Sequence, residues 1–223
     1  MEVVPIPTRP TRSEEISQRI LKWSEANLRI FPWRENRTPY RIMVAEFLLK
    51  RTTARAADRV YQTFLEKYPN ITELSKAEVC DLEVILSTLG YHKLRSRAIK
   101  ETAVYVVKHY SARLPTDLIE LLSIPNIGHY TAGAIMSLGH GKRAQMVDSN
   151  VERVIIRMFK NSVPDKVIGR WVRETVDGII PDIKHDRFNL ALIDLGATVC
   201  TYRACYCERC PVGCVCDTYN KGF

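Results

Sequence analysis

The sequence predicts an all-α protein, and three observations support that fold class. Apolar residues recur at helical spacing along most of the chain, as Ile16, Ile20 and Trp23 do at i, i+4 and i+7. No segment alternates apolar and polar residues in the way that a half-buried strand requires. Hydrophobic residues make up 46% of the 223, so the chain can bury a core and is not globally disordered.

The first helices are predicted from capping residues and prolines. Thr11 and Glu14 form a potential capping box at the start of a helix. Residues 31–40, FPWRENRTPY, end that helix with two prolines and a charged loop. Pro39 suits the first position of a second helix, and a third helix is predicted over residues 55–68.

Helical signals continue beyond residue 70. Ser75 and Glu78 predict a second capping box, and Gly90 predicts the left-handed end of that helix. A basic helix is expected over residues 92–109, and Thr116 is expected to start a short helix. Period and propensity predict further helices over residues 149–159, 164–179 and 186–199.

The charge balance favours a polyanionic partner. Lys and Arg number 33 against 25 Asp and Glu, which gives a formal net charge of +8. Such an excess suits nucleic acid or an anionic membrane surface. No apolar run approaches the roughly 18 residues of a membrane-spanning helix, and the N-terminal segment lacks a signal-peptide core. We therefore expect a soluble, intracellular protein.

A tight turn joins two predicted helices at residues 123–135, SIPNIGHYTAGAI. Pro125 restricts φ, Asn126 tolerates the left-handed region, and Gly128 can adopt a positive φ. The free N–H groups at the start of the second helix can bind an anion such as a backbone phosphate, without reading its sequence. The turn alone leaves an ordinary corner between two helices equally open.

The turn resembles the helix-hairpin-helix of DNA repair glycosylases in the endonuclease III superfamily. The matching positions are Leu122, Pro125, Ile127 and Gly128. Asn126 stands where the first glycine is usual, and Asn is among the least disruptive replacements there. The resemblance covers about residues 15–217. It implies that the hairpin contacts DNA through Asn126, Ile127, Gly128 and His129.

Asp148 follows Gly128 by twenty residues and opens a predicted helix. By itself, an Asp at a helix start is an N-cap. In the endonuclease III superfamily, which this sequence resembles, a catalytic Asp follows the hairpin at about this distance. The resemblance therefore implies a catalytic role for Asp148. Its carboxylate would stabilise the positive charge that builds on the deoxyribose, and would orient or deprotonate the attacking water. Asn150 is expected to join it in the nucleotide pocket.

Tyr130 stands where bifunctional members of this superfamily carry a lysine that forms a Schiff base. A phenol cannot form an imine, and Lys142 and Arg143 lie too far along the chain to replace that lysine. We therefore predict a monofunctional glycosylase, which removes a base and leaves an abasic site. Tyr130 would line the pocket against the extruded nucleotide; a partly buried core tyrosine is the alternative.

Six of the seven cysteines lie in the last 24 residues. In a chain without an export signal, such crowding indicates a metal centre rather than a disulfide framework. Four of them have the spacing C-x6-C-x2-C-x5-C: Cys200, Cys207, Cys210 and Cys216. Four thiolates suit zinc or a [4Fe-4S] cluster. The single C-x2-C unit favours iron–sulfur, and the spacing resembles the cluster loop of the same superfamily.

The remaining cysteines are not assigned by spacing. Cys205 and Cys214 could be alternative ligands or could pair with each other. Cys80 lies in an apolar helical pattern and is predicted to be a small buried hydrophobe. Arg203 and Arg209, within the cysteine-rich segment, could present cations to phosphates. The cluster is expected to shape this segment and not to take part in base chemistry.

Residues 31–54 resemble both the MutY-type adenine glycosylases and the archaeal Mig-type thymine-DNA glycosylases. Both branches carry a Glu at the position of Glu46, which acts as a general acid in the adenine enzymes. Glu46 lies in an apolar helix, where burial favours the protonated carboxyl group; a solvated position on the helix face is the alternative.

Lys50 and Arg51 favour the thymine branch, because MutY-type enzymes have Gln-Gln there and the thymine enzymes have Arg-Arg. By position, Arg51 would enter the duplex beside Lys50 and hydrogen-bond the orphaned guanine. A plain phosphate contact is the alternative. MutY-type proteins also add a C-terminal domain that inspects 8-oxoguanine, whereas this sequence ends seven residues after Cys216.

Together these features predict a two-lobed helix-hairpin-helix glycosylase fold. Residues 31–141 would form a six-helix barrel with the hairpin, and residues 1–30 and 142–223 a lobe that carries the [4Fe-4S] cluster. The expected enzyme is a monomer, acting in the cytoplasm at the nucleoid, that removes thymine or uracil mispaired with guanine from double-stranded DNA. An adenine glycosylase acting opposite guanine or 8-oxoguanine, and a non-catalytic DNA-binding module, are the alternatives.

Overall fold

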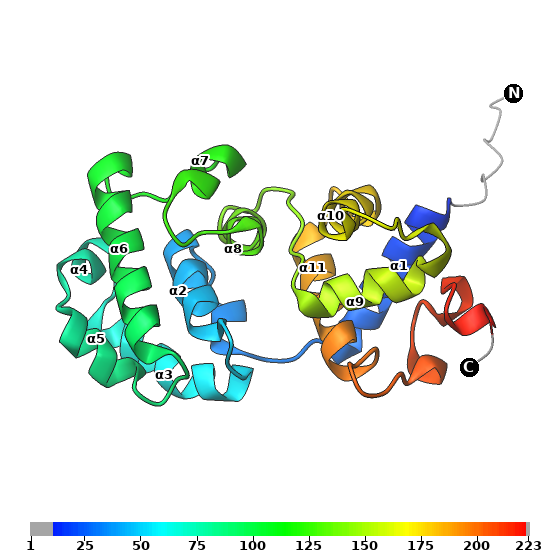
Figure 1. Cartoon of the computed structure of the whole chain (residues 1–223), viewed down its shortest axis with the longest axis horizontal. Helices are drawn as coiled ribbons and strands as arrows, with labels where there is room; N and C mark the ends of the chain where they lie inside the picture. The colour runs from blue at the N-terminus through cyan, green and yellow to red at the C-terminus, as the bar shows by residue number, and fades with distance from the viewer. Residues whose placement is uncertain (1–10, 222–223) are drawn as a thin grey trace, which may run out of the picture. The chain divides into compact units, whose positions relative to one another are not determined.

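The computed structural model describes residues 11–221, and Figure 1 shows that they fold into helices. Among these residues no strand forms; one isolated antiparallel bridge pairs Cys200 with Cys205. The all-α prediction is therefore confirmed. The α-helices are α1 (Arg12–Asn27), α2 (Pro39–Leu49), α3 (Ala54–Lys67), α4 (Ile71–Lys76), α5 (Val79–Leu86), α6 (His92–Tyr110), α7 (Leu118–Ser123), α8 (His129–Ala134), α9 (Ser149–Met158), α10 (Ile168–Ile179) and α11 (His185–Thr198).

Two compact units divide the chain. The hairpin unit, Arg29–Met146, contains α2 to α8. The cysteine unit consists of residues 11–28 and 147–221, with α1, α9, α10, α11 and the cysteine-rich segment, residues 200–216. The boundaries between the two units therefore lie after Leu28 and after Met146, whereas the sequence analysis placed them after residues 30 and 141. Within residues 11–221, none of the helices has the length and apolar character that crossing a membrane would need.

Helix α2 forms the centre of the hairpin unit. All seven residues from Ile42 to Leu48 are buried, so this helix has no solvated face over those two turns. It contacts α3, α6 and α8, and Figure 1 shows it between α6 and α8. The amphipathic α3 adds Tyr61 and Phe64, each at most 1% exposed; burying a Phe of this kind contributes about 1.5–3 kcal/mol.

Small residues after the hairpin allow a close approach between backbones. A Cβ on Gly133, in α8, would lie 2.1 Å from the Gln145 carbonyl oxygen. A Cβ on Gly139, at the end of the π-helical turn Ile135–Gly139, would lie 2.8 Å from Cα of Pro39. Glycine is thus needed at both positions, because residues 145–146 pass directly against Gly133 and the start of α2 passes directly against Gly139.

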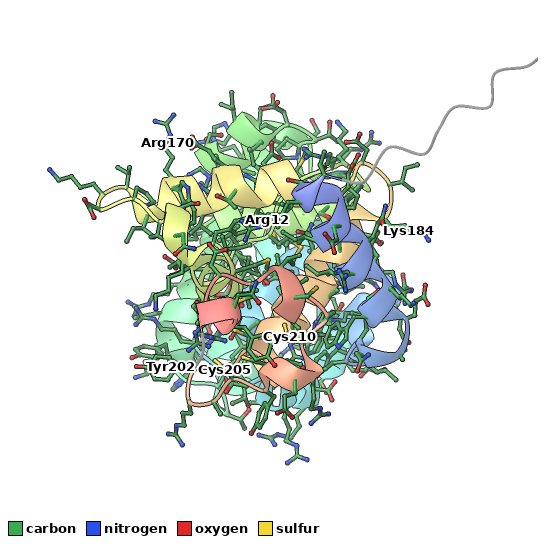
Figure 2. All side chains as sticks on the ribbon, turned by 90° about the vertical axis from the view of Figure 1, so that its right-hand side faces the viewer. Arg12, Arg170, Lys184, Tyr202, Cys205 and Cys210 are labelled. Carbon is green, nitrogen blue, oxygen red and sulfur yellow. The ribbon has the colours of Figure 1, made fainter. Side chains whose placement is uncertain are left out.

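In the cysteine unit, α1 packs on α11 and its first residue reaches the C-terminal segment. The predicted capping box is confirmed: Thr11 accepts from the Glu14 N–H, and the Glu14 carboxylate accepts from the Thr11 N–H at 2.8 Å. Arg12 Nη2 donates to Asp217 at 2.7 Å and to the Val215 carbonyl at 2.8 Å. Figure 2 looks onto this unit and shows Arg12 near the cysteine-rich segment.

Several local expectations differ from the structure. The helix predicted between Ser75 and Gly90 begins later, as α5, and Ser75 lies inside α4, which Asn70 caps by accepting from the Glu73 N–H at 3.0 Å. Glu78 precedes α5 without a side-chain cap; the predicted Ser75–Glu78 capping box is wrong. Cys80 is exposed, so the prediction of a small buried hydrophobe is wrong; α5 buries Leu82 and Leu86 instead. Helix α10 begins at Ile168 and not at residue 164.

Candidate functional site

The predicted hairpin joins α7 to α8, and its backbone uses Asn126 rather than Gly128 for the left-handed position. Asn126 has φ 67°, as its tolerance of that region predicts. Gly128 is extended, with φ −100° and ψ 178°, so the positive φ expected there is not found. A Cβ on Gly128 would meet no atom within 4 Å, so the space beside this residue is open.

Helix α6 and the end of α2 hold the hairpin in place. Thr102 Oγ1, on α6, donates to the Pro125 carbonyl at 2.8 Å. Asn126 Nδ2 donates to the carboxylate of Glu101 at 3.0 Å. Lys50 Nζ, just beyond α2, donates to the Asn126 carbonyl at 2.8 Å. The structure thus brings two of the predicted DNA-contacting residues, Lys50 and Asn126, together.

The four hairpin residues predicted to contact DNA differ in exposure. Asn126, Gly128 and His129 are exposed. Ile127 is only 5% exposed, and its N–H donates to the Ile124 carbonyl at 3.2 Å. The Ile127 side chain therefore packs the hairpin against its own unit, and the DNA contact stays a prediction for all four residues.

Glu46 and Lys50 lie one helical turn apart. Glu46 is 5% exposed, so the solvated helix face considered for it does not apply. Lys50 Nζ lies 4.2 Å from the centre of the Phe47 ring. Partial burial lowers the pKa of Lys50; the negative charge of Glu46 opposes that shift, and the positive charge of Arg95 adds to it. Lys50 is itself exposed, and its ammonium is held beside the hairpin by the hydrogen bond to the Asn126 carbonyl.

Arg51, the residue expected to enter the duplex, is exposed immediately after α2. Its backbone is left-handed, with φ 53°. Its guanidinium carbon lies 5.3 Å from the centre of the Tyr91 ring, within the range of a cation–π contact. Tyr91 is 58% exposed and also left-handed, with φ 57°, so the left-handed position expected at Gly90 falls on its neighbour. The sequence alone did not single out Tyr91.

Tyr130 is the second residue of α8 and is half-buried. The residues after it, Thr131 to Leu138, are all buried. Its side chain thus lies at the border between the core of the hairpin unit and solvent, and the role proposed for it from sequence stays a prediction. Tyr130 and Glu46 belong to the hairpin unit, whereas Asp148 and Asn150 belong to the cysteine unit.

Asp148 is the N-cap of α9 and is half-buried. Its Oδ1 accepts from the N–H groups of Asn150 at 2.9 Å and Val151 at 2.8 Å. Its Oδ2 accepts from Asn150 Nδ2 at 2.8 Å. The capping role suggested by sequence is confirmed, and the pairing of Asp148 with Asn150 places two predicted site residues in direct contact.

Arg153 extends this hydrogen-bond chain into α11. Its Nη2 donates to Asn150 Oδ1 at 2.9 Å and to the Gly196 carbonyl at 2.6 Å, and its Nε donates to the Cys200 carbonyl at 2.9 Å. A Cβ on Gly196 would lie 2.7 Å from the Asn150 Cβ. Sequence reasoning missed Arg153, although its position three residues after Asn150 puts both on one face of α9.

The four predicted metal ligands line one small pocket. Burial raises the pKa of Cys200 and Cys207, and raises that of Cys210 to about 12. Arg157 Nη1 lies 3.4 Å from Cys200 Sγ. Within residues 11–221, no group of three or more His, Cys, Asp or Glu side chains is arranged to hold a metal ion. The residues that line the pocket include Cys200, Cys205, Cys207, Cys210 and Cys216.

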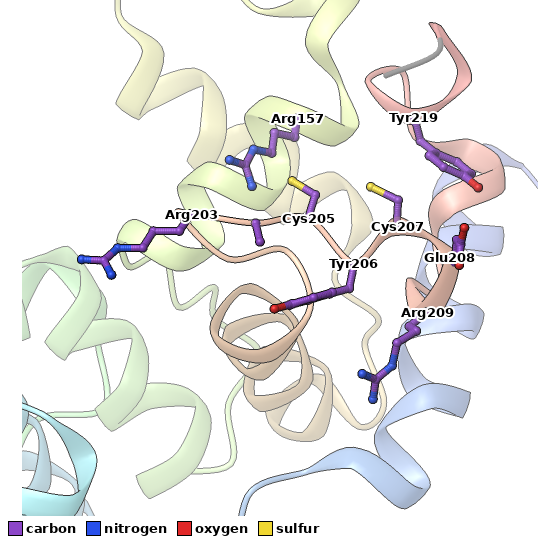
Figure 3. Close-up of a pocket in the computed structure, with 9 residues that line it drawn as sticks. Arg157, Arg203, Cys205, Tyr206, Cys207, Glu208, Arg209 and Tyr219 are labelled. Carbon is purple, nitrogen blue, oxygen red and sulfur yellow. The ribbon is translucent and has the colours of Figure 1, made fainter.

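The structure separates the two unassigned cysteines. Cys205 lines the same pocket as the predicted ligands, and Figure 3 shows its sulfur on the same side as that of Cys207, toward Arg157. Cys214 is exposed and is not among the residues that line that pocket. A larger adjoining pocket, of about 570 Å³, is lined by Arg157, Arg203, Ala204, Cys205, Tyr206, Cys207, Glu208, Arg209 and Tyr219.

The chain is similar in sequence and fold to known DNA repair proteins. Residues 44–168 match the family described as HhH-GPD superfamily base excision DNA repair protein. A thymine/uracil-DNA glycosylase of Methanothermobacter thermautotrophicus is 34% identical over 203 residues, which cover 91% of this chain and 92% of that protein. An adenine DNA glycosylase of Buchnera aphidicola is 32% identical, covering 92% of this chain and 59% of that protein. The solved structure of a thermostable thymine-DNA glycosylase matches with a TM-score of 0.89 and 33% identity, over 94% of this chain and 97% of that one.

Proposed function

The chain belongs to the HhH-GPD superfamily of base excision DNA repair proteins, and we propose that it is a monofunctional DNA glycosylase for thymine and uracil mispaired with guanine. The observation that carries the choice of base is the similarity to thymine-DNA glycosylases over nine-tenths of both sequence and fold. Lys50 and Arg51 support the same branch. An adenine glycosylase is the second candidate, because adenine DNA glycosylases match nearly as well in identity.

Asp148 is the proposed catalytic carboxylate. When the bond between the base and C1′ breaks, the electron pair leaves with the base and positive charge develops on the sugar. A carboxylate beside C1′ stabilises that charge and accepts the proton of the attacking water. Asn150 and two N–H groups hold both oxygens of Asp148 in one orientation, so little reorganisation is needed at the moment of reaction.

Tyr130 supports the monofunctional assignment. Strand cleavage through a Schiff base needs an amine at the sugar, and the phenol of Tyr130 offers none. Glu46, buried in α2 of the same unit, is the proposed acid at the base. The reaction should therefore end at the abasic site, with the strand intact until it is treated with alkali.

The proposed DNA contacts lie on exposed residues that the fold already fixes. Asn126, Gly128 and His129 are exposed in the hairpin. The Lys50 ammonium donates a hydrogen bond to the hairpin, and Arg51 is the next residue in the chain. In a protein with a net charge of +8, such a surface predicts salt-sensitive, sequence-independent affinity for double-stranded DNA.

The residues of the small pocket suit a [4Fe-4S] cluster in donor type, because five cysteines line it and the cluster needs four thiolates. By their spacing, and because all four line the pocket, Cys200, Cys207, Cys210 and Cys216 would each hold one iron, with Cys205 as an alternative ligand. When bound, the cluster would cross-link four points of the C-terminal segment and supply no base chemistry. Arg157, which already contacts Cys200 Sγ, would hydrogen-bond a cluster thiolate.

Base excision under single-turnover conditions tests the proposal. Duplexes that contain G·T, G·U, G·A or 8-oxoguanine·A would be incubated with the protein and with Asp148→Asn. We expect excision of thymine and uracil, a requirement for alkali before the strand breaks, and loss of activity in the variant. Excision confined to the adenine duplexes would replace the first candidate with the second. Excision of no base would favour a DNA-binding module.

A further inference from the structure

Arg95 is a buried arginine whose side chain joins two chain segments. It lies in α6 and is 6% exposed. Its guanidinium donates to the carbonyls of Phe47, Leu48, Lys50 and Gly90. The donor–oxygen distances are 3.1 Å to Leu48, 2.7 Å to Lys50 and 2.8 Å to Gly90. One side chain thus supplies donors to the otherwise open C-terminus of α2 and to the turn before α6.

Each of the two segments that Arg95 joins contains a residue with a left-handed backbone, and the side chains of these two residues are in contact. Arg51 and Tyr91 each follow a carbonyl that Arg95 binds, and each has a left-handed backbone. This conformation is costly for residues other than glycine, so it persists only where the surroundings enforce it. The Arg51 guanidinium lies over the Tyr91 ring. By fixing both backbones, Arg95 determines where the two side chains meet.

We propose that Arg95 is a positioning residue for opposite-base recognition, acting through Arg51. Arg95 binds both the end of α2 and the Gly90–Tyr91 turn. The Arg51 side chain is thereby held against the Tyr91 ring, in a fixed position from which it contacts the base left unpaired. The proposal deepens the proposed function and rests on it. Because a rigid presentation removes the cost of ordering a flexible side chain, it strengthens the distinction between guanine and other bases.

The chemistry of Arg95 explains why an arginine occupies this position. Its planar fork offers donors in several fixed directions, which reach carbonyls on two segments at once. A lysine offers three donors from one nitrogen and cannot span both segments equally well. Arg95→Lys should therefore retain most of the folding stability but lose much of the preference for guanine as the opposite base.

Lys100 provides a matched control on the same helix. Its Nζ donates to the carbonyl of Ala77, the C-cap of α4, so it also joins α6 to a helix end. That helix end carries none of the residues proposed to contact DNA. Lys100→Met thus removes an interaction of the same kind without touching Arg51.

The experiment compares excision of uracil from G·U and A·U duplexes at saturating enzyme, with thermal unfolding measured in parallel. We expect Arg95→Met to lower the G·U rate about tenfold, as expected for a displaced recognition group, and to lower the G·U to A·U ratio similarly. Lys100→Met should lower Tm but leave the ratio unchanged. In the double variant Arg51→Ala/Arg95→Met, the ratio should equal that of Arg51→Ala alone, because Arg95 acts through Arg51.

Binding separates failure of this proposal from failure of the proposed function. The affinity for duplexes that carry a tetrahydrofuran abasic analogue opposite G or opposite A gives a second G-to-A ratio, which depends on binding alone and not on base excision. A wild type that binds with a preference for G but excises nothing would contradict the proposed function while leaving the Arg95 variants informative. The proposal would be overturned if the G·U to A·U ratio were unchanged in both Arg95→Met and Arg95→Lys. It would also be overturned if Arg51→Ala/Arg95→Met lowered that ratio by the product of the two single effects. If Arg95→Met does not fold, Arg95→Lys decides the outcome alone.

Discussion

Replacing Gly196 by alanine should displace the proposed catalytic carboxylate through direct steric contact. Gly196 lies in α11, where a Cβ would stand 2.7 Å from the Asn150 Cβ and 2.9 Å from the Asn150 carbonyl oxygen. Ordinary contacts of this kind begin at 3.4 Å, so α9 must move by about 0.7 Å relative to α11. Asn150 is bonded to Asp148 Oδ2, so the carboxylate moves with it.

The expected size of the effect follows from that displacement. Overpacking by one methyl group costs about 1–3 kcal/mol, which in a chain of this length lowers Tm by about 2–12 °C. A catalytic group misplaced by about 1 Å can cost about a hundredfold in rate. For a shift of about 0.7 Å we expect excision of uracil from a G·U duplex to slow about tenfold or more.

Single-turnover excision and thermal unfolding would be measured on Gly196→Ala and on Gly178→Ala. Gly178 lies in α10 of the same unit, where a Cβ would meet no atom within 4 Å, so its replacement should raise stability by roughly 0.5–1 kcal/mol and leave the rate unchanged. A folded Gly196→Ala protein that excises uracil at the wild-type rate would refute the coupling from α11 through Asn150 to Asp148.

Three further predictions use other contacts. Asp148→Asn should slow excision more than about a hundredfold while changing stability by less than about 1 kcal/mol, because Asn also caps helices; rate and Tm together check this. Burial raises the pKa of Tyr61 to about 12, so the unfolded state releases this proton first, and stability should fall as the pH rises from about 10 toward 12. Tyr61→Phe should reduce that fall, measured as the denaturant midpoint against pH. Cys214→Ser should retain the iron and visible absorbance of the purified protein, whereas Cys210→Ser should lose both, because Cys210 lines the pocket and Cys214 is exposed.

Signals that act within a few residues could be read from the sequence. The cap at Thr11 and Glu14 and the start of α2 at Pro39 both appear as predicted. Asn126 takes the left-handed position of the hairpin because its own side chain tolerates it. Asp148 caps α9 and pairs with Asn150, two residues away, through contacts that its helix position alone determines.

Predictions failed where neighbours compete or where distant segments decide. Ser75 does not cap the predicted helix, because Asn70 starts a separate short helix, α4, that includes Ser75, and α5 begins only after Glu78. Cys80 is exposed, although it lies in an apolar segment, because the eight-residue helix α5 buries only Leu82 and Leu86. The left-handed position moved from Gly90 to Tyr91, beside a carbonyl that a buried arginine binds.

The helical class, the hairpin and the four candidate metal ligands could be predicted from the sequence, because helical period, capping and Cys spacing are local properties of the chain. The residues that support the site became visible only in the folded protein. Arg153 joins Asn150 to α11, and Arg95 joins the end of α2 to the turn before α6. Both arginines bind carbonyls that lie far from them along the chain, and main-chain carbonyls carry no sequence signature.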